Sequence, residues 1–326
     1  MPGLSEFELI ETLLKPLAEN APGAFSLSDD AALLPDAQQG HGYIVTKDAL
    51  AVGVHMRAED PPGDMARKAL RVNLSDLAAM GAHPVGFFMA LCLGQNSDET
   101  FLRAFVTGLA DDVDIFSAPL MGGDIIRHSG PFTVTITAIG SAPKGEVLRR
   151  NEAQTGDSLW VSGTIGDGVL GLMAANGELP SLSQVDQAAL IERYRVPVPR
   201  LILGAELGGL ATACIGISDG LVSDVGHICA ASSVGCTIDA ASVPLSSAAT
   251  AVVSSDGLVL PTLLTGGDDY ELAFAVRQGA ENDVIAISEK VGVPVTRIGT
   301  FESGKGVKVF DQNGKAMAFT ETGYKH

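Results

Sequence analysis

Apolar positions follow helical spacing in some stretches of the chain and strand spacing in others. Helical spacing predicts amphipathic helices over residues 5–17, 61–81, 99–116, 167–175, 200–207 and 221–231. Short apolar or alternating runs bounded by Gly, Pro and Asp predict strands over residues 43–46, 85–93, 118–121, 132–139, 158–162 and 271–276. Because both halves mix helices with partly alternating strands, we expect an α/β fold of the α+β kind, with mixed or antiparallel sheets packed against helices.

Local signals mark where several of these elements begin or turn. Ser5 and Glu8 form a capping box at the start of the first helix, and Pro61 and Pro62 mark the start of the second. The sequence Gln-Asn-Gly at 312–314 predicts a hairpin turn near the C-terminus. These signals agree with the boundaries that the periodicity gives.

The length of the chain and one polar stretch predict two domains. A chain of 326 residues is longer than one hydrophobic core usually organises. Residues 141–156 are polar and include Pro143, Gly145 and Gly156, and regular patterns resume after them. We expect an N-terminal domain over residues 1–140 and a C-terminal domain over residues 141–326.

The charge and the cysteine content of the chain limit the classes of function and the cellular location that we expect. The net charge is −18 at pH 7, which repels nucleic acid and anionic membranes, so neither is an expected partner. The four cysteines form no C-x-x-C pair, which argues against a zinc knuckle and fits a reducing compartment. No apolar run has the length of a membrane span, and the first residues lack the basic region of a signal peptide. We therefore expect a cytoplasmic protein.

Aspartates in loops beside Gly are the main candidates for chemistry. Carboxylate oxygens are ligands that Mg²⁺ prefers, and Mg²⁺ bridges them to substrate phosphates. Asp and Gly are also ordinary turn residues, so any one position has a structural explanation too. Eight positions in similar contexts favour metal-assisted phosphate chemistry: Asp29, Asp30, Asp48, Asp76, Asp124, Asp219, Asp268 and Asp269.

Asp76 differs from the other aspartates because it lies inside an amphipathic helical pattern. It neighbours the apolar Leu74 and Leu77, where an unpaired carboxylate is costly. Metal binding would explain this position, and so would a salt bridge with Arg67, Lys68 or Arg71.

Two glycine-containing segments could bind phosphate through backbone N–H groups. The segment Gly122-Gly123-Asp124 follows an apolar run, and Gly allows the backbone to approach an anion. The segment Ser218-Asp219-Gly220 opens a predicted helix whose free N–H groups attract phosphate, although an ordinary N-cap is the better explanation of Ser218 taken alone. His55 could bind a ligand or be a surface histidine at a strand end. No P-loop, dinucleotide fingerprint or protein-kinase signature is present.

Taken in order, these motifs resemble the thiamine-monophosphate kinase family. The matching stretches are D-D-A-A-L-L at 29–34, T-K-D-A-L-A-V-G-V-H at 46–55, A-R-K-A-L-R-V-N-L-S-D-L-A-A-M-G-A-H-P at 66–84, G-G-D at 122–124, I-S-D-G-L-V-S-D-V-G-H-I at 217–228 and G-G-D-D-Y-E-L-A-F at 266–274. The wider superfamily includes aminoimidazole ribonucleotide synthetase and selenophosphate synthetase. The resemblance implies two α/β domains and a homodimer formed through the N-terminal sheets.

The resemblance also implies an activity, which is ATP-dependent phosphorylation of thiamine monophosphate to thiamine diphosphate. The acceptor is an anionic phosphate oxygen, so no general base is expected. By position, the family pattern makes Mg²⁺ ligands of Asp30, Thr46, Asp48, Asp76, Asp124 and Asp219. It assigns to ATP the residues Gly123, Asp124, Arg150 and Ser218, and to thiamine monophosphate His55 and Asp268. The N-terminal domain would bind ATP and Mg²⁺ and form the dimer, and the C-terminal domain would complete the active site.

The chain departs from the family pattern at several positions. Gly216 stands where the family has an aspartate, Asp268 where glutamate is frequent, and Lys47 where a small polar residue is usual. Two threonines after G-G-D are replaced by Ile125 and Ile126, and the place of a C-terminal aromatic is taken by Glu321, Thr322 and Tyr324. Two alternatives therefore remain open. One is a diverged superfamily member acting on another small phosphate acceptor, and the other is a nucleotide-binding regulator without turnover.

Overall fold

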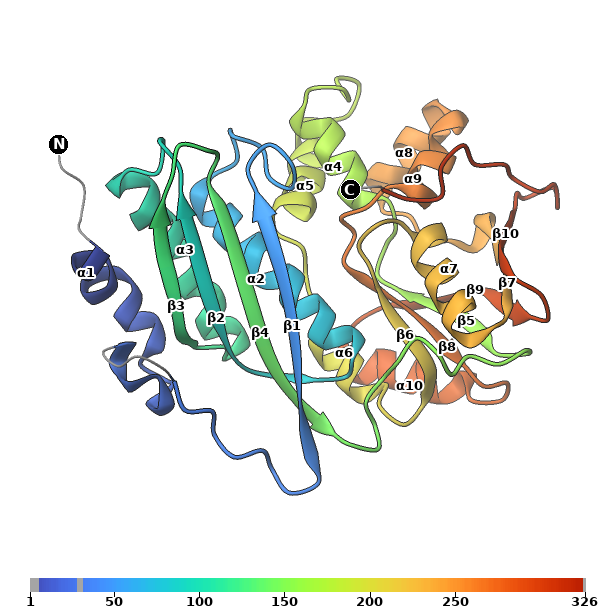
Figure 1. The fold of residues 1–326 in the computed structure, drawn as a ribbon. Coiled ribbons are helices and arrows are strands. Elements are labelled where there is room, and N and C mark those ends of the chain that lie inside the picture. The colour runs from blue at the N-terminus through green and yellow to red at the C-terminus, as the bar shows by residue number, and fades with distance from the viewer. Residues whose placement is uncertain (1–5, 28–31, 325–326) are drawn as a thin grey trace. The chain divides into compact units, whose positions relative to one another are not determined.

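The structure is a computed structural model that describes residues 6–27 and 32–324. The chain divides into two compact units. The N-terminal unit comprises Met1–Leu77 and Ala82–Lys144, and the C-terminal unit comprises Ala78–Gly81 and Gly145–His326. Each unit contains one mixed sheet packed with helices (Figure 1), so the expected fold class is confirmed.

The sheet of the N-terminal unit has four strands in the order β1-β4-β2-β3. β4 pairs antiparallel with both β1 and β2, whereas β2 and β3 are parallel. The alternation that predicted a half-buried antiparallel strand at 132–139 is confirmed, because β4 lies inside the sheet. The strands are β1 (His41–Ala51), β2 (His83–Leu93), β3 (Leu120–Arg127) and β4 (Thr133–Pro143).

The two faces of this sheet differ in what covers them. Helices α2 (Pro62–Ala79) and α3 (Glu99–Phe116) lie along one face (Figure 1). On the other face, Val45 and Ile126 are 61% and 50% exposed. We call this second surface the open face, and strand alternation assigns to it Val45, Lys47, Ala49, Phe88, Ala90, Cys92, Asp124, Ile126, Thr133, Thr135 and Thr137.

The first helical segment is not the single regular helix that the sequence predicts. It divides into α1 (Glu6–Leu9), a π-helical turn η1 (Ile10–Leu14) and a 3₁₀ turn η2 (Lys15–Ala18), followed by η3 (Pro22–Leu27). Pro16 has no N–H to donate, so the α-helical hydrogen bonds cannot continue unchanged through the last turn. The predicted capping residue Ser5 lies outside the described residues.

The sheet of the C-terminal unit has six strands in the order β10-β7-β9-β5-β8-β6. β6 and β8 are antiparallel neighbours, so the loop that leaves β6 adjoins the loop that enters β8. The hairpin turn predicted at 312–314 is present, since the Asp311 N–H donates to the Lys315 carbonyl. The strands are β5 (Ser158–Ser162), β6 (Ala211–Ile217), β7 (Gly235–Asp239), β8 (Glu271–Val276), β9 (Val295–Glu302) and β10 (Gly306–Phe310).

Helices of the C-terminal unit form two groups. α7 packs against β6, β7 and β10 over the main core of the sheet. α4, α5, α8 and α9 surround a smaller core that includes Leu170, Leu190, Ala249 and Leu263. The helices are α4 (Asp167–Ala175), α5 (Gln184–Arg195), α6 (Leu201–Glu206), α7 (Leu221–Ser232), η4 (Ala240–Ser242), α8 (Ser247–Ser255), η5 (Gly257–Val259), α9 (Leu260–Thr265) and α10 (Glu281–Val291).

Candidate functional site

Strand β1 and helix α2 place three of the predicted metal ligands in one layer of the N-terminal unit. Thr46 Oγ1 donates to Asp76 Oδ2 at 2.6 Å. Asp48 follows Thr46 by two residues and therefore points to the same side of β1. Asn73 Oδ1 accepts the Asp48 N–H at 3.1 Å, and Asn73 Nδ2 donates to the Ala69 carbonyl at 3.0 Å. The buried Asn73 thus ties the backbone of β1 to α2 beside the candidate ligands.

The two arginines considered as partners of Asp76 pair with another residue. Arg71 donates to both carboxylate oxygens of Asp112, at 2.6 and 2.8 Å, and Arg67 Nε donates to the same carboxylate at 3.3 Å. Asp112 lies on α3 and is 0% exposed. These contacts join α2 to α3.

His55 lies in the turn that follows β1. The Ala51 N–H donates to His55 Nδ1 at 3.3 Å, so the neutral ring carries its proton on Nε2. The His55 carbonyl accepts Lys68 Nζ at 3.1 Å, and Lys68 is only 2% exposed. Gly53 has a φ of +88°, which a glycine adopts without strain. The turn therefore holds His55 at both its ring and its backbone.

The G-G-D segment lies inside β3 and not after a strand, contrary to expectation. A Cβ on Gly123 would lie 1.8 Å from the Met89 carbonyl oxygen, so the close approach of β2 and β3 requires this glycine. The strand registers place Gly123 on the same face as Asp48, and they place Asp124 on the open face. Asp48 and Asp124 lie in strands, so the expected loop positions are wrong for these two, whereas Asp76 lies in a helix, as its amphipathic pattern predicts.

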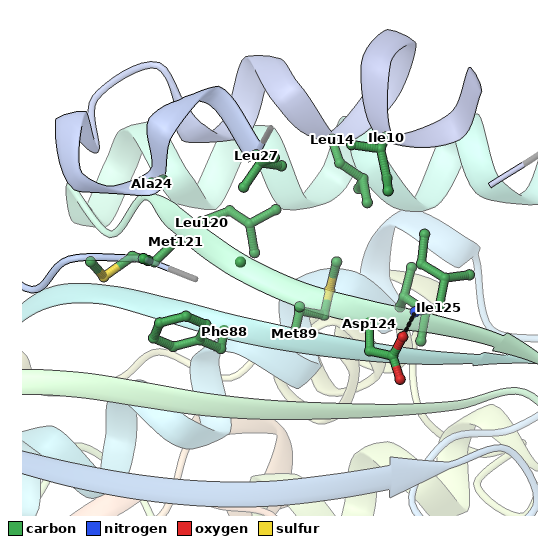
Figure 2. Close-up of a pocket in the computed structure, with 14 residues that line it drawn as sticks. Ile10, Leu14, Ala24, Leu27, Phe88, Met89, Leu120, Met121, Asp124 and Ile125 are labelled. Carbon is green, nitrogen blue, oxygen red and sulfur yellow. Dashed lines mark hydrogen bonds between the residues drawn. The ribbon is translucent and has the colours of Figure 1, made fainter. Parts of the chain in front are cut away.

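A cavity of about 470 Å³ lies between β3 and the N-terminal helical segment. Ile10, Leu14 and Leu27 line it from the helical side (Figure 2). β2 and β3 contribute the backbone of Gly122 and Gly123 and several apolar side chains. Among the described residues that line the cavity, Asp124 is the charged one. The cavity therefore combines apolar walls with one carboxylate and with exposed glycine backbone.

In the C-terminal unit, the loops at the ends of β6 and β8 bring Ser218, Asp219 and Asp268 together. The Asp268 N–H donates to the Ser218 carbonyl at 2.9 Å. The Tyr324 N–H donates to the Asp219 carbonyl at 2.9 Å, so the C-terminal tail meets the same loops. The exposed Arg150 is held elsewhere in this unit, where its carbonyl accepts Ser232 Oγ at 2.9 Å.

The backbone N–H groups of Ser218, Asp219 and Gly220 are not free, contrary to expectation. All three donate to Asp224 Oδ2, at 3.0, 3.0 and 3.2 Å. Asp224 lies in the first turn of α7 and is buried. Burial raises the pKa of Asp224 to about 7, against the lowering effect of these N–H groups. An internal carboxylate thus takes the place that was expected for a phosphate oxygen.

The segment that enters β8 has an unusual backbone. Asp268 and Tyr270 have φ angles of +70° and +52°, and Tyr270 Oη donates to Asp268 Oδ1 at 3.0 Å. Between them, the buried Asp269 accepts the N–H groups of Gly166 at 2.8 Å and Gly168 at 3.0 Å. Burial raises the pKa of Asp269 to about 8, and the two N–H groups oppose this rise.

Six of the predicted site residues form two groups, one in each unit. The N-terminal group comprises Thr46, Asp48 and Asp76, and the C-terminal group comprises Ser218, Asp219 and Asp268. Asp29 and Asp30 lie outside the described residues. Over residues 6–27 and 32–324, no group of three or more His, Cys, Asp or Glu residues is close enough to hold a metal ion.

Comparisons with known proteins relate these residues to a family. The sequence matches AIR synthase related protein, N-terminal domain, over residues 28–142 and the C-terminal domain of the same description over residues 154–312. A thiamine-monophosphate kinase from Caulobacter vibrioides is 40% identical over 99% of this chain and 91% of its own length. The chain belongs to the thiamine-monophosphate kinase family. The resemblance inferred from the sequence is thereby confirmed.

Solved structures of thiamine-monophosphate kinases have the same fold over both units. The crystal structure of the enzyme from Stenotrophomonas maltophilia K279a has a TM-score of 0.85 and 38% identity, and covers 97% of this chain and 99% of that one. A structure described as AaThiL complexed with AMPPCP and TMP has a TM-score of 0.77 and 29% identity, and covers 99% and 97%.

This member of the thiamine-monophosphate kinase family has two buried polar residues, Asn73 and Asp224, to which the sequence pattern assigned no role. Asn73 lies three residues before Asp76, on a neighbouring position of the same helix surface. Asp224 lies in the first turn of α7, where a carboxylate favours the helix N-terminus. Both spacings are visible in the sequence, so the sequence alone could have indicated Asn73 and Asp224. The contacts of Lys68 and Asp269 have no such local signal. The same holds for the buried Glu271, which accepts hydrogen bonds from Arg193 and Arg200.

In the described part of this kinase-family chain, no single helix is long and apolar enough to cross a membrane. One pair of helices, Ser247–Ser255 and Gly257–Thr265, reaches such a length and composition together, but across a bend of 115°. All four cysteines are free.

Proposed function

We propose that this protein is a thiamine-monophosphate kinase, which transfers the terminal phosphate of ATP to thiamine monophosphate and releases thiamine diphosphate and ADP. The observation that carries the proposal is end-to-end similarity, at 40% identity, to a thiamine-monophosphate kinase. Similarity over 99% of the chain to a protein solved with AMPPCP and TMP supports this pair of substrates.

We propose that Mg²⁺ is the metal, with ligands drawn from Asp30, Thr46, Asp48, Asp76, Asp124 and Asp219. The donor set fits, because all six residues offer oxygen and because Thr46 Oγ1 and Asp76 Oδ2 lie 2.6 Å apart. Bound Mg²⁺ would neutralise negative charge on the ATP phosphates. Asp124 stands apart from the β1–α2 group, because it belongs to the open face.

The protein's own residues would act by positioning, since an anionic phosphate acceptor needs no general base. We assign ATP to Gly123, Asp124, Arg150 and Ser218. The cavity beside β3 suits the nucleobase, because apolar walls pack on an aromatic ring. We assign thiamine monophosphate to His55 and Asp268. The Nε2–H of His55 is a donor that suits a phosphate oxygen.

We also propose that the N-terminal unit binds ATP and Mg²⁺ and forms the homodimer, and that the C-terminal unit completes the active site. The open face supports dimerisation, because it exposes the apolar Val45 and Ile126 on a sheet whose other face is covered by helices. Four free cysteines support a cytoplasmic location, where thiols stay reduced.

A direct transfer assay tests the proposed function. Purified protein is mixed with MgATP and thiamine monophosphate, and the products are separated by chromatography. Thiamine and an aminoimidazole ribonucleotide serve as alternative acceptors. We expect thiamine diphosphate from thiamine monophosphate alone. Product from another acceptor would favour a diverged superfamily member, and ATP binding without any product would favour a nucleotide-binding regulator.

A further inference from the structure

We infer that Asp269 is a positioning residue for the thiamine monophosphate site. Its buried side chain anchors the segment 267–270 to helix α4 and thereby fixes the carboxylate of the neighbouring Asp268. This inference rests on the proposed function, in which Asp268 contacts the substrate.

The anchor consists of two hydrogen bonds to the start of α4. Asp269 Oδ2 accepts the Gly166 N–H at 2.8 Å, and Oδ1 accepts the Gly168 N–H at 3.0 Å. Asp269 is 1% exposed. The N-cap of α4 is Gly166, which has no side chain to accept these protons. Asp269 therefore caps α4 from a position about a hundred residues further along the chain, and the helix dipole favours a carboxylate there.

The anchored segment has a backbone that its own residues do not favour. Asp268 and Tyr270 are left-handed, with φ of +70° and +52°, and neither is a glycine. Such conformations persist only where the surroundings enforce them. The Asp268 N–H donates to the Ser218 carbonyl at 2.9 Å, and the Tyr270 N–H donates to the Ile217 carbonyl at 2.8 Å. Main-chain bonds to β6 hold one side of the segment, and Asp269 holds the other side on α4.

Two glycines allow this close packing. A Cβ on Gly168 would lie 2.4 Å from the Asp268 carbonyl, and a Cβ on Gly267 would lie 2.3 Å from the Ser218 carbonyl oxygen. The segment is therefore enclosed between α4 and the loop after β6, with no room to shift while its anchors remain.

The same segment directs the Asp268 carboxylate. Tyr270 Oη donates to Asp268 Oδ1 at 3.0 Å, so the orientation of this carboxylate depends on both left-handed residues. Arg193 Nη2 donates to the Asp269 carbonyl at 3.4 Å and to Glu271 Oε1 at 2.9 Å. Loss of the hydrogen bonds to the Asp269 side chain would allow Asp268 and Tyr270 to leave their left-handed conformations, and the Asp268 carboxylate would then move. A displacement of about 1 Å in a positioning group costs up to about 100-fold in rate.

Kinetics of Asp269→Asn, with Ser183→Ala as the matched control, test the inference. Ser183 caps the N-terminal end of α5 through the Asp186 N–H at 3.1 Å, whereas Arg193 contacts the segment from the other end of this helix. Its loss should therefore destabilise the start of α5 without removing a hydrogen bond to the segment. We expect Asp269→Asn to raise the KM for thiamine monophosphate by about 10-fold or more, with the KM for ATP changed by less than about twofold. Ser183→Ala should lower the urea midpoint and leave both KM values unchanged.

A double variant shows whether Asp269 acts through Asp268. We expect Asp269→Asn to add little to the KM increase of Asp268→Ala, because the anchored carboxylate is already absent. The inference is overturned if Asp269→Asn leaves the KM for thiamine monophosphate unchanged. It is also overturned if the substitution multiplies KM equally in the wild-type and Asp268→Ala backgrounds.

Amide hydrogen exchange gives a readout that does not depend on turnover. Asp269→Asn should accelerate exchange in peptides that cover residues 266–271, and Ser183→Ala should not. If the wild-type protein forms no thiamine diphosphate, the proposed function fails, and exchange alone then decides whether Asp269 holds the segment. Equal exchange in the wild type and in Asp269→Asn would overturn the anchor.

Discussion

Asn73 and Asp224 hold main-chain segments that carry residues assigned to ligands. Asn73 accepts the Asp48 N–H, and Asp224 accepts three N–H groups from residues 218–220. Both side chains are buried. Removing Asp224 would leave the N–H of the buried Gly220 without this acceptor, which costs about 1–3 kcal/mol. At the scale of residues, the candidate site therefore depends on side chains that need not touch a substrate.

Asp48→Asn and Asp76→Asn should each lower the rate of phosphate transfer by at least about 100-fold while the fold survives. The amide keeps the size of the carboxylate, and Asn at 76 can still accept the Thr46 hydroxyl, but the negative charge for a cation is lost. Steady-state rates and circular dichroism would measure the two effects. Asp114→Asn, on the exposed surface of α3, is the control and should retain the wild-type rate. Near-normal rates in either test variant would remove that residue from the metal assignment.

The pKa of Asp269 predicts a pH dependence of stability. Burial raises this pKa from 3.8 to about 8, with Asp167 adding to the rise and Arg193 opposing it. The folded protein therefore favours the neutral form. The stability that this preference contributes is complete below pH 4 and is lost as the pH rises toward 8, on the order of 1 kcal/mol per pH unit.

Urea unfolding of the wild type and of Asp269→Asn between pH 6 and pH 9 would measure this effect. The wild type should lose stability relative to Asp269→Asn up to about pH 8 and then level off. A constant difference between the two proteins would mean that Asp269 does not titrate in this range.

At the scale of elements, α2 contacts α3 through one of its surfaces and β1 through another. Arg67 and Arg71 are four residues apart and pair with Asp112 on α3. Asn73 and Asp76 are three residues apart and meet β1. The helix therefore fixes the candidate metal ligands relative to α3 as well as to β1.

Asp112→Asn should destabilise the N-terminal unit by about 3 kcal/mol or more. The substitution leaves the cationic Arg71 buried beside a neutral amide, and breaking a buried pair on one side is costly. Urea unfolding followed by circular dichroism would detect the change as an earlier transition. Asp111→Asn alters the adjacent exposed position of α3 and should have little effect. Equal midpoints for the two variants would show that the buried pair contributes little.

The sequence predicts elements well where the apolar period is long and regular. α3 and the buried strands β5 and β8 begin and end at the predicted residues, because capping residues, Gly and Pro bound a clear pattern. The prediction of one regular first helix is wrong because Pro16 changes the hydrogen bonding of its last turns. The sequence predicts a loop at the G-G-D segment because Gly and Asp are frequent in turns, yet close packing on Met89 holds the segment in β3.

The sequence predicts residues of the candidate site but not the contacts that these residues make. The order of the motifs along the chain predicts Asp48, Asp76, Asp219 and Asp268. Tertiary contacts then decide what surrounds them, as when Asp269 meets Gly166 and Gly168 about a hundred residues away. Such pairs share no local period, so a single sequence does not reveal them.

At the scale of the whole molecule, the open face is the surface through which we propose that the homodimer forms. Helices α2 and α3 cover one side of this sheet, and on the other side Val45 and Ile126 stay exposed, although Phe88 packs against the N-terminal helical segment. Cys92 lies on this face and is half-buried in the single chain, whereas Cys214, Cys229 and Cys236 are buried. Burial raises the pKa of Cys214 to about 12, which keeps that thiol protonated and unreactive.

The protein should sediment as a dimer, and Val45→Asp should convert it to a monomer, because the new charge would be buried between two open faces. Alkylation of Cys92 should then become faster in the variant. Ile115→Asp is the matched control, since Ile115 is 62% exposed on α3, away from the open face. A wild-type monomer, or an equal shift caused by Ile115→Asp, would contradict dimerisation through this face.

Asp224 gives the loop at 218–220 its shape before a ligand arrives. Three N–H groups converge on one carboxylate oxygen, much as they would on an oxygen of a bound phosphate. Because the protein supplies this acceptor oxygen itself, the loop is preorganised, and the entropy of ordering it does not oppose binding. Asp219 therefore lies on a segment whose conformation is set during folding. The rate at which a ligand associates with this loop should then depend on diffusion and charge, and not on a slow rearrangement of the chain.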